Sequence, residues 1–303
     1  MTAASERSRA SQWRGRRRPI SALAACALLA GALAGCGGGD EPDEGADGAT
    51  STATATGSAR VDGVVDIGGR GLYMRCAGSG SPTVVMEAGD GDTSGSYSYA
   101  EQSLAGVTRT CVYDRANLGL SDPAPGPRGL GELTGDLEAL LEAGDVPPPY
   151  VLVGSSGGGY IVAGYAVEHQ EEVAGVVLVD TAMPFRNPPP GIVAETDPDN
   201  PDNVEHRDYL QVEKDAWAAR RSLGPVPVRV LSADFPADEE ALAETASERR
   251  ATRQNVPEQR GWLALSPLAR QVVAQTGHDI GAEDPELLIG QIRNVVEEAR
   301  ASG

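Results

Sequence analysis

A serine stands among glycines at the end of a predicted buried strand. Residues 150–160 read YVLVGSSGGGY, where β-forming residues lead into glycines and serines and then into apolar residues. The run Gly154–Gly158 fits G-x-S-x-G with Ser156 at its centre, and glycines suit a turn too sharp for side chains. A serine on such a strand-to-helix turn exposes its hydroxyl as a nucleophile. An ordinary or phosphate-binding loop is the alternative, because 38 of the 303 residues are glycine.

A serine hydroxyl is a weak nucleophile and needs a base within hydrogen-bonding reach. Histidine is the side chain whose ordinary pKa suits that role at neutral pH. The chain has three histidines. His169 ends a predicted helix, where a solvated residue is expected, and His206 lies in an irregular segment. His278 follows a predicted strand and a glycine, and it is therefore the candidate base.

Predicted strands and helices alternate along residues 61–303. A hairpin around Gly68 and Gly69 comes first. Strands are predicted at 82–89, 108–114, 150–153, 173–180, 226–234 and 270–279, and helices at 96–105, 131–146, from about 158, 204–223, 237–253 and 284–301. This alternation implies a mostly parallel sheet with helices on both faces. Residues 183–224, rich in proline and acid, interrupt it.

Four segments, in this order, resemble those of the α/β-hydrolase superfamily. They are the serine turn at 154–158, CVYDRANLGLSD at 111–122, VAGVVLVD at 173–180 and TGHDIGAEDPELL at 276–288. The resemblance covers about residues 61–301 and implies an α/β fold with an eight-stranded type of sheet. It also implies that Ser156 is the nucleophile, that His278 is the base, and that residues 183–224 form a short cap over the pocket.

The third residue of such a site is an acid that orients the imidazole and stabilises its protonated form. The family commonly places it just after the strand predicted at 228–232, but Asp234 and Asp238 do not have the usual spacing there. Some members take the acid from the end of the preceding strand, where this chain has Asp180. We expect Asp180 to be the acid, with Asp234 and then Asp238 as alternatives. A helix cap or a turn is the other role for Asp180.

An acyl-transfer site also needs two preorganised N–H donors for the oxyanion. The resemblance assigns them to the backbone of Gly157, directly after the serine, and of Asp90, directly after the segment MEAG. The Asp90 carboxylate is then expected to point away from the site, because a negative charge beside an oxyanion is unfavourable.

The N-terminal part of the chain has the composition of an export signal and a tether. Residues 14–36 combine basic, apolar and small residues, which is typical of a secretory signal, and the apolar part is shorter than the roughly 20 residues of a membrane span. Its end, LAGC, resembles the bacterial lipoprotein motif, which implies removal of residues 1–35 and lipidation of Cys36. Residues 36–60 are then a disordered tether, and residues 61–303 form one domain.

Charge and cysteine content restrict the partners of the exported domain. Residues 1–35 hold six Arg and one Glu, so 19 of 25 basic and 43 of 44 acidic residues remain beyond them. This balance argues against nucleic acid and against direct adsorption to anionic lipid, so the lipid anchor is the expected membrane contact. Cys76 and Cys111 are expected to form a disulfide, with free buried thiols as the alternative. No cofactor and no metal site are expected.

These features predict a hydrolase exported and anchored outside the cytoplasmic membrane, with a small-molecule acyl substrate. A carboxylic ester or a small amide would be cleaved through an acyl-enzyme. An acyltransferase or a peptidase of the same superfamily is an alternative, because the same acyl-enzyme serves these reactions. A ligand-binding lipoprotein without catalytic activity, built on the same fold, is the alternative from another class of protein.

Overall fold

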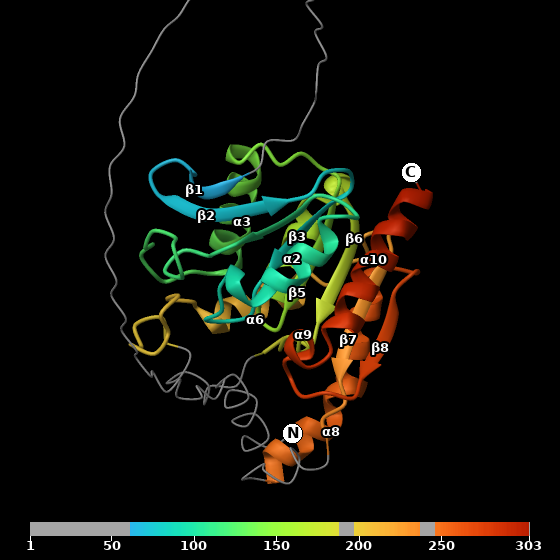
Figure 1. The fold of residues 1–303 in the computed structure, drawn as a ribbon. Coiled ribbons are helices and arrows are strands. Elements are labelled where there is room, and N and C mark those ends of the chain that lie inside the picture. The colour runs from blue at the N-terminus through green and yellow to red at the C-terminus, as the bar shows by residue number, and fades with distance from the viewer. Residues whose placement is uncertain (1–60, 188–196, 237–245, 303) are drawn as a thin grey trace, which may run out of the picture. The chain divides into compact units, whose positions relative to one another are not determined.

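A computed structural model describes residues 61–187, 197–236 and 246–302 (Figure 1). The predicted signal segment, Cys36 and the predicted tether lie outside the described residues. None of the described helices is long and apolar enough to cross a membrane.

Eight strands form one sheet at the centre of the domain (Figure 1). They are β1 (Asp62–Asp66), β2 (Gly71–Ala77), β3 (Thr83–Glu87), β4 (Thr110–Tyr113), β5 (Tyr150–Ser155), β6 (Val173–Val179), β7 (Val228–Ala233) and β8 (Arg270–Ala274). Their order is β1-β2-β4-β3-β5-β6-β7-β8. β2 pairs antiparallel with β1 and β4, and all the other neighbours are parallel. The predicted fold class is confirmed.

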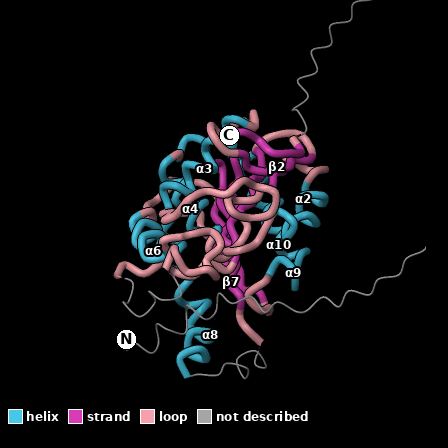
Figure 2. The backbone as a smooth tube through the Cα atoms, turned by 90° about the vertical axis from the view of Figure 1, so that its left-hand side faces the viewer, coloured by secondary structure: helices cyan, strands magenta, loops and turns pink. Residues whose placement is uncertain are grey.

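Helices cover both faces of this sheet. They are α2 (Ser98–Leu104), α3 (Leu130–Ala143), α4 (Gly158–Glu168), α6 (Tyr209–Ala218), α8 (Ala246–Gln259), α9 (Ile280–Glu283) and α10 (Pro285–Ser302), with short 3-10 helices at Ser94–Tyr97, Gln170–Glu172 and Arg260–Leu265. Figure 2 shows α3, α4 and α6 on one side of the strands, and α2, α9 and α10 on the other. This arrangement is the one that alternating strands and helices predict.

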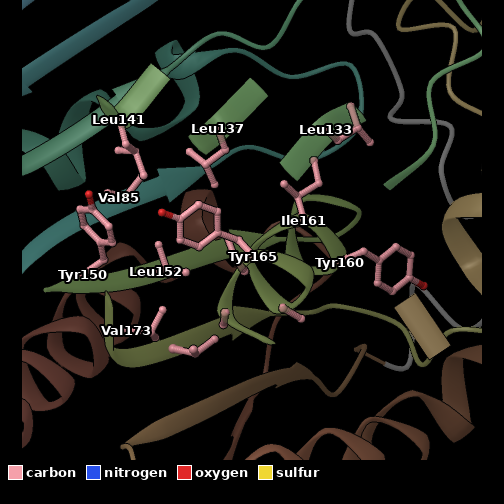
Figure 3. Close-up of a cluster of buried hydrophobic side chains, with 14 of the residues drawn as sticks. Val85, Leu133, Leu137, Leu141, Tyr150, Leu152, Tyr160, Ile161, Tyr165 and Val173 are labelled. Atoms are coloured by element: carbon pink, nitrogen blue, oxygen red, sulfur yellow. The ribbon is translucent and has the colours of Figure 1, made fainter. Parts of the chain in front are cut away.

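Each face of the sheet has its own apolar core, because successive side chains of a strand point to opposite faces. Leu152 of β5 packs in a cluster with Leu137 of α3 and Ile161 of α4 (Figure 3). The next residue, Val153, belongs to the other cluster with Ile292 of α10. Parallel strands covered on both faces have continuous apolar sequences, which is why the sequence predicts them well.

Two helices differ most in their bounds from the sequence prediction. The helix predicted at 204–223 is shorter, and α6 begins after Asp208, whose side chain caps it by accepting a backbone N–H. The helix predicted at 237–253 is described as α8, which runs to Gln259 through Pro257. The predicted residues before Ala246 lie outside the described part.

The insertion predicted as a cap lies between β6 and β7 and includes α6. α6 packs against α3 and α4. Ahead of α6, Arg207 forms a parallel β-bridge with Arg128, and the Arg128 N–H donates to the carbonyl oxygen of His206 at 2.8 Å. The insertion is thereby fixed to the chain just before α3.

The two cysteines of the described residues form a disulfide, as predicted from their number and setting. Cys76 of β2 and Cys111 of β4 are direct partners in the antiparallel pairing of these strands. Both side chains are buried. The bond therefore joins the antiparallel edge of the sheet to its parallel part.

Candidate active site

Ser156 lies on a tight turn between β5 and α4. Its φ is +53°, in the left-handed region that residues other than glycine rarely adopt. Its backbone N–H donates to the carbonyl oxygen of Val179 at 2.8 Å, which ties the turn to the end of β6. A Cβ on Gly158 would lie 2.8 Å from the carbonyl oxygen of Glu87, so only glycine fits there. The strand, turn and helix predicted around Ser156 are all present.

His278 lies between Ser156 and Asp180. Its Nε2 is 2.8 Å from Oγ of Ser156, and its Nδ1 is 2.6 Å from Oδ2 of Asp180. Ser156 and Asp180 follow β5 and β6, and His278 follows β8, so they meet at the carboxyl edge of the parallel strands, where ligands of such sheets bind. The structure thus brings together the three residues that the sequence selected.

Asp180 controls the protonation of His278. Burial lowers the pKa of His278, but the hydrogen bond and the charge of Asp180, together with the charges of Asp279 and Asp90, raise it by more, so the pKa lies above its ordinary value. A carboxylate at Nδ1 favours the tautomer with its proton on that nitrogen. Nε2 is then left to accept a hydrogen bond from the Ser156 hydroxyl.

The alternative acids do not take this position. Asp234 is exposed, and its carboxylate accepts a hydrogen bond from Nε2 of Gln275 at 2.8 Å. Asp238 lies outside the described residues. Asp180 is buried and is the carboxylate that contacts His278. Within the described ranges, no group of three or more His, Cys, Asp and Glu side chains has an arrangement suited to a metal ion.

Two carboxamides that the sequence did not single out hold the other oxygen of Asp180. Oδ1 accepts hydrogen bonds from Nδ2 of Asn255 and from Nε2 of Gln259, both at 2.7 Å, and from the N–H of Ala233 at 3.0 Å. Asn255 and Gln259 are four residues apart on α8, so they share one face of that helix. This spacing was the only sign of them in the sequence.

The Asp90 carboxylate does not point away from Gly157, so that expectation was wrong. A Cβ on Gly157 would lie 2.5 Å from Cγ of Asp90, which means that the carboxylate fills the space of the missing side chain. Oδ1 of Asp90 forms an ion pair with Nη1 of Arg207, a buried residue of the insertion. The expectation failed because it did not take into account Arg207, a cation that lies 117 residues further along the chain.

Arg207 belongs to a buried charge network behind the loop at 88–91. Glu205 accepts hydrogen bonds from Nε of Arg115 at 2.6 Å and from the Gly91 N–H at 2.8 Å. Arg115 also donates to two backbone carbonyl oxygens of the loop. Burial raises the pKa of Glu205, but Arg115 and Arg207 together lower it to about 2. The loop is therefore held by ionised side chains from two distant segments.

The protein family described as the alpha/beta hydrolase fold matches residues 82–250. This range is more than half of the chain and includes Ser156 and Asp180. The chain therefore belongs to the α/β-hydrolase family. The predicted membership of the α/β-hydrolase superfamily is confirmed.

Solved structures of two bacterial enzymes have a similar fold. A thermophilic esterase from Thermogutta terrifontis is 21% identical with a TM-score of 0.56, over 80% of this chain and 99% of the esterase. An enol-lactonase from Burkholderia xenovorans LB400 is 18% identical with a TM-score of 0.55, over 77% and 99% of the two chains. At this identity the likeness shows the fold alone.

Curated relatives match this chain over only part of their own length. The protein named Probable transporter efuK, from Hormonema carpetanum, is 29% identical over 301 residues, which cover 79% of this chain and 43% of that protein. The chain spans less than half the length of the first curated relatives that it matches.

Proposed function

We propose that the protein is a serine hydrolase that cleaves carboxylic esters, or small amides, through an acyl-enzyme. The hydrogen-bonded chain from Ser156 through His278 to Asp180, with distances of 2.8 and 2.6 Å, carries this proposal. A protein that only binds a ligand has no need for a serine joined to a base that an acid orients. An esterase and an enol-lactonase have a similar fold, so this fold can carry a site for esters.

The first half of the reaction transfers the acyl group to Ser156. Oγ attacks the carbonyl carbon while its proton moves to Nε2 of His278, and the carbonyl oxygen becomes an oxyanion. The Asp180 carboxylate stabilises the imidazolium that forms. When the tetrahedral intermediate collapses, Nε2 returns the proton to the leaving alcohol or amine, and the acyl group stays on Oγ.

The second half releases the acid. Water attacks the acyl-enzyme and gives a proton to Nε2 of His278, and a second tetrahedral oxyanion forms. Its collapse breaks the bond to Oγ, and Nε2 returns the proton to Ser156. An alcohol or amine in place of water would give acyl transfer by the same steps. Product analysis with an added alcohol separates these two outcomes.

The backbone N–H groups of Gly157 and Asp90 are the proposed oxyanion donors. Among the described loops and turns, neither N–H donates to a backbone carbonyl oxygen. Arg207 pairs with the Asp90 carboxylate, which keeps a net negative charge from facing the oxyanion. The charge network described above fixes the loop that carries one of these donors.

Labelling with a fluorophosphonate probe tests the proposal. The probe phosphonylates a serine only when a base activates it, so the full-length protein should be labelled and Ser156→Ala should not. His278→Ala should be labelled at least about a hundredfold more slowly, given the size of general-base effects. Folded wild-type protein that remains unlabelled would instead support a ligand-binding protein on this fold.

We also propose that the protein is exported and anchored outside the cytoplasmic membrane by a lipid on Cys36. The signal-like sequence that ends in LAGC supports this proposal. The Cys76–Cys111 disulfide agrees with an oxidising compartment. Incorporation of an alkyne-tagged fatty acid into the wild-type chain, and its loss in Cys36→Ser, is the expected result. Equal incorporation in the two chains would contradict the assignment.

A further inference from the structure

Asp180 is a buried carboxylate whose partners include no arginine or lysine among the described contacts. It is 3% exposed. Oδ2 faces His278, and Oδ1 accepts hydrogen bonds from Asn255, Gln259 and the backbone of Ala233. A buried carboxylate is costly to keep ionised unless hydrogen bonds or a cation compensate for the lost water. Here neutral N–H donors supply that compensation.

The two carboxamides are themselves held in place. Nε2 of Gln259 also donates to Oδ1 of Asn255 at 2.9 Å, and Nδ2 of Asn255 also donates to the carbonyl oxygen of Ala233 at 2.9 Å. Gln259 is buried, at 1% exposure. Each amide is therefore oriented by partners other than Asp180, so both donors are directed at the carboxylate before a substrate binds.

The two side-chain donors come from α8, and this explains how an acid at the end of β6 is supported. The acid follows β6 rather than β7, and the acid after β7, Asp234, is exposed. α8 packs against β7 and lies beyond its end (Figure 1), and β7 is the neighbour of β6 in the sheet. Its last turns bring Asn255 and Gln259 to Oδ1 of Asp180. α8 thus links the acid to the segment that follows β7.

The choice of neutral donors has a chemical consequence. An arginine or lysine at the same place would also hold the carboxylate, but its positive charge would weaken the attraction between Asp180 and the imidazolium of His278. Carboxamides fix the position of Oδ1 and leave the full negative charge for His278. They suit an acid that must stabilise a cation during the reaction.

We propose that Asn255 and Gln259 are positioning residues that hold Asp180 against Nδ1 of His278. This inference rests on the proposed serine hydrolase and names the residues that orient its acid. They act through Asp180 and touch neither the substrate nor the reacting atoms. Replacement of their carboxamides should therefore lower kcat only in a chain that has Asp180.

The test compares Asn255→Leu and Gln259→Met with the full-length wild type, using a p-nitrophenyl ester. We expect kcat to fall about 10- to 100-fold while KM stays within about threefold, in line with the loss of supporting contacts around a catalytic group. The acid limb of the pH–rate profile should move to lower pH, because Asp180 no longer raises the pKa of His278 as strongly, while the charges of Asp279 and Asp90 still raise it. In an Asp180→Asn background, the same substitutions should change kcat by less than about threefold.

A variant that keeps the shape of the side chain guards against misfolding. Gln259→Glu places a carboxylate against Asp180 and should lower kcat, whereas in Asp180→Asn it faces an amide and should not lower kcat further. Gln271→Met is the matched control, since Nε2 of Gln271 donates to the carbonyl oxygen of Val256 on α8 without contact with Asp180. Its kcat and acid limb should equal those of the wild type.

Two results would overturn the inference. One is an unchanged kcat and acid limb in folded Asn255→Leu, Gln259→Met and Gln259→Glu. The other is an equal loss of kcat with and without Asp180, which would mean that the carboxamides only stabilise the fold. Fluorophosphonate labelling of the wild type separates these results from failure of the proposed function, because an unlabelled wild type overturns both.

Discussion

In the proposed mechanism, the protonation of His278 decides the pH range in which Ser156 is activated. Neutral Nε2 accepts the serine proton there, and Asp180, with the charges of Asp279 and Asp90, raises the pKa of His278 against the effect of burial. kcat/KM for a p-nitrophenyl ester should therefore be lost as the pH falls through a value above about 6.5, the ordinary pKa of histidine. Asp180→Asn should move this midpoint to lower pH and reduce kcat by about three to four orders of magnitude.

A pH–rate series on the wild type and Asp180→Asn measures both midpoints. Asp234→Asn is the control, because its carboxylate contacts Gln275 and not His278. Its profile should match that of the wild type. A midpoint in Asp180→Asn at or above the wild-type value would contradict the role given to Asp180.

Arg207 neutralises a carboxylate that lies beside a proposed oxyanion donor. Burial raises the pKa of Asp90, and Arg207 lowers it. Glu205 also raises this pKa, and Arg115 and His278 also lower it. In Arg207→Met the pKa of Asp90 should rise further. Above that pKa the unpaired charge opposes the oxyanion, so kcat should fall as the pH rises. A unit charge about 5 Å away costs about 3 kcal/mol at an effective dielectric constant of about 20, roughly a hundredfold in rate.

The pH–rate profile of Arg207→Met measures this alkaline fall. Arg207→Met combined with Asp90→Asn should abolish it, because no charge is then left beside Gly157. Arg229→Met is the control, since it removes another buried guanidinium. Arg229 pairs with Glu298 and lies near the start of β7, whereas the site lies at the other end of the parallel strands. A combined variant with the same alkaline fall as Arg207→Met would show that Arg207 acts only on the fold.

Individual residues of the site differ in how far the sequence predicted them. Ser156 and His278 follow from local patterns, because each lies in a short segment with a distinctive order of residue types. Asp180 required a choice among three carboxylates. The direction of the Asp90 side chain was predicted wrongly, since it depends on the missing side chain of Gly157 and on a distant arginine.

At the scale of elements, the junction between β5 and α4 leaves no space at Gly158. A Cβ there would lie 2.8 Å from the carbonyl oxygen of Glu87, which belongs to the buried strand β3. Gly158→Ala should therefore lower the free energy of unfolding by about 1–3 kcal/mol, as overpacking does. It should also lower kcat, because the turn that moves carries Ser156.

Chemical denaturation of the wild type and the variant measures this loss. Gly131→Ala on α3 is the matched control, because a Cβ at Gly131 meets nothing within 4 Å. Alanine is favoured over glycine within a helix, so the control should gain about 0.5–1 kcal/mol. A Gly158→Ala variant as stable as the wild type would mean that the junction adjusts to a side chain.

The elements themselves were predictable to different degrees. The central strands and α3, α4 and α10 follow from continuous apolar runs or from helical spacing of apolar residues. α8 has a polar sequence, and the sequence does not tell which of its faces meets the sheet. Its proposed role is to position Asp180 through Asn255 and Gln259. These contacts exist only in the folded chain, so the sequence of α8 does not predict them.

The whole domain is one sheet between two helical layers, each with its own apolar core. The alternation of apolar runs and amphipathic segments was sufficient to predict this arrangement. The path of the described part of the insertion between β6 and β7 was not predictable from its apolar residues alone, because ion pairs fix it together with the packing of α6. Arg207 and Glu205 bind it to the loop after β3 and to Arg115, whose places in the fold are set by the sheet.

The Cys76–Cys111 disulfide stabilises the domain as a whole rather than the site. It joins residues 35 apart in sequence, and a cross-link over such a loop stabilises a protein by about 3–4 kcal/mol. Ser156, Asp180 and His278 all lie outside the loop that it closes, and the segment 88–91 inside it is held separately by hydrogen bonds to Arg115 and Glu205. The combined change Cys76→Ala and Cys111→Ala should therefore lower the free energy of unfolding by about that amount.

Denaturation curves and ester hydrolysis, measured on the same samples, check this expectation. Well below the melting temperature, kcat should remain within about twofold of the wild type, because β3 still pairs with β4 and β5 on either side. Reduction of the wild type should reproduce the loss of stability and leave the variant unchanged, which separates the covalent bond from the smaller alanine side chains. A reduced wild type as stable as the oxidised protein would mean that strand pairing alone holds β2 to β4, and the disulfide would then offer no support for export to an oxidising compartment.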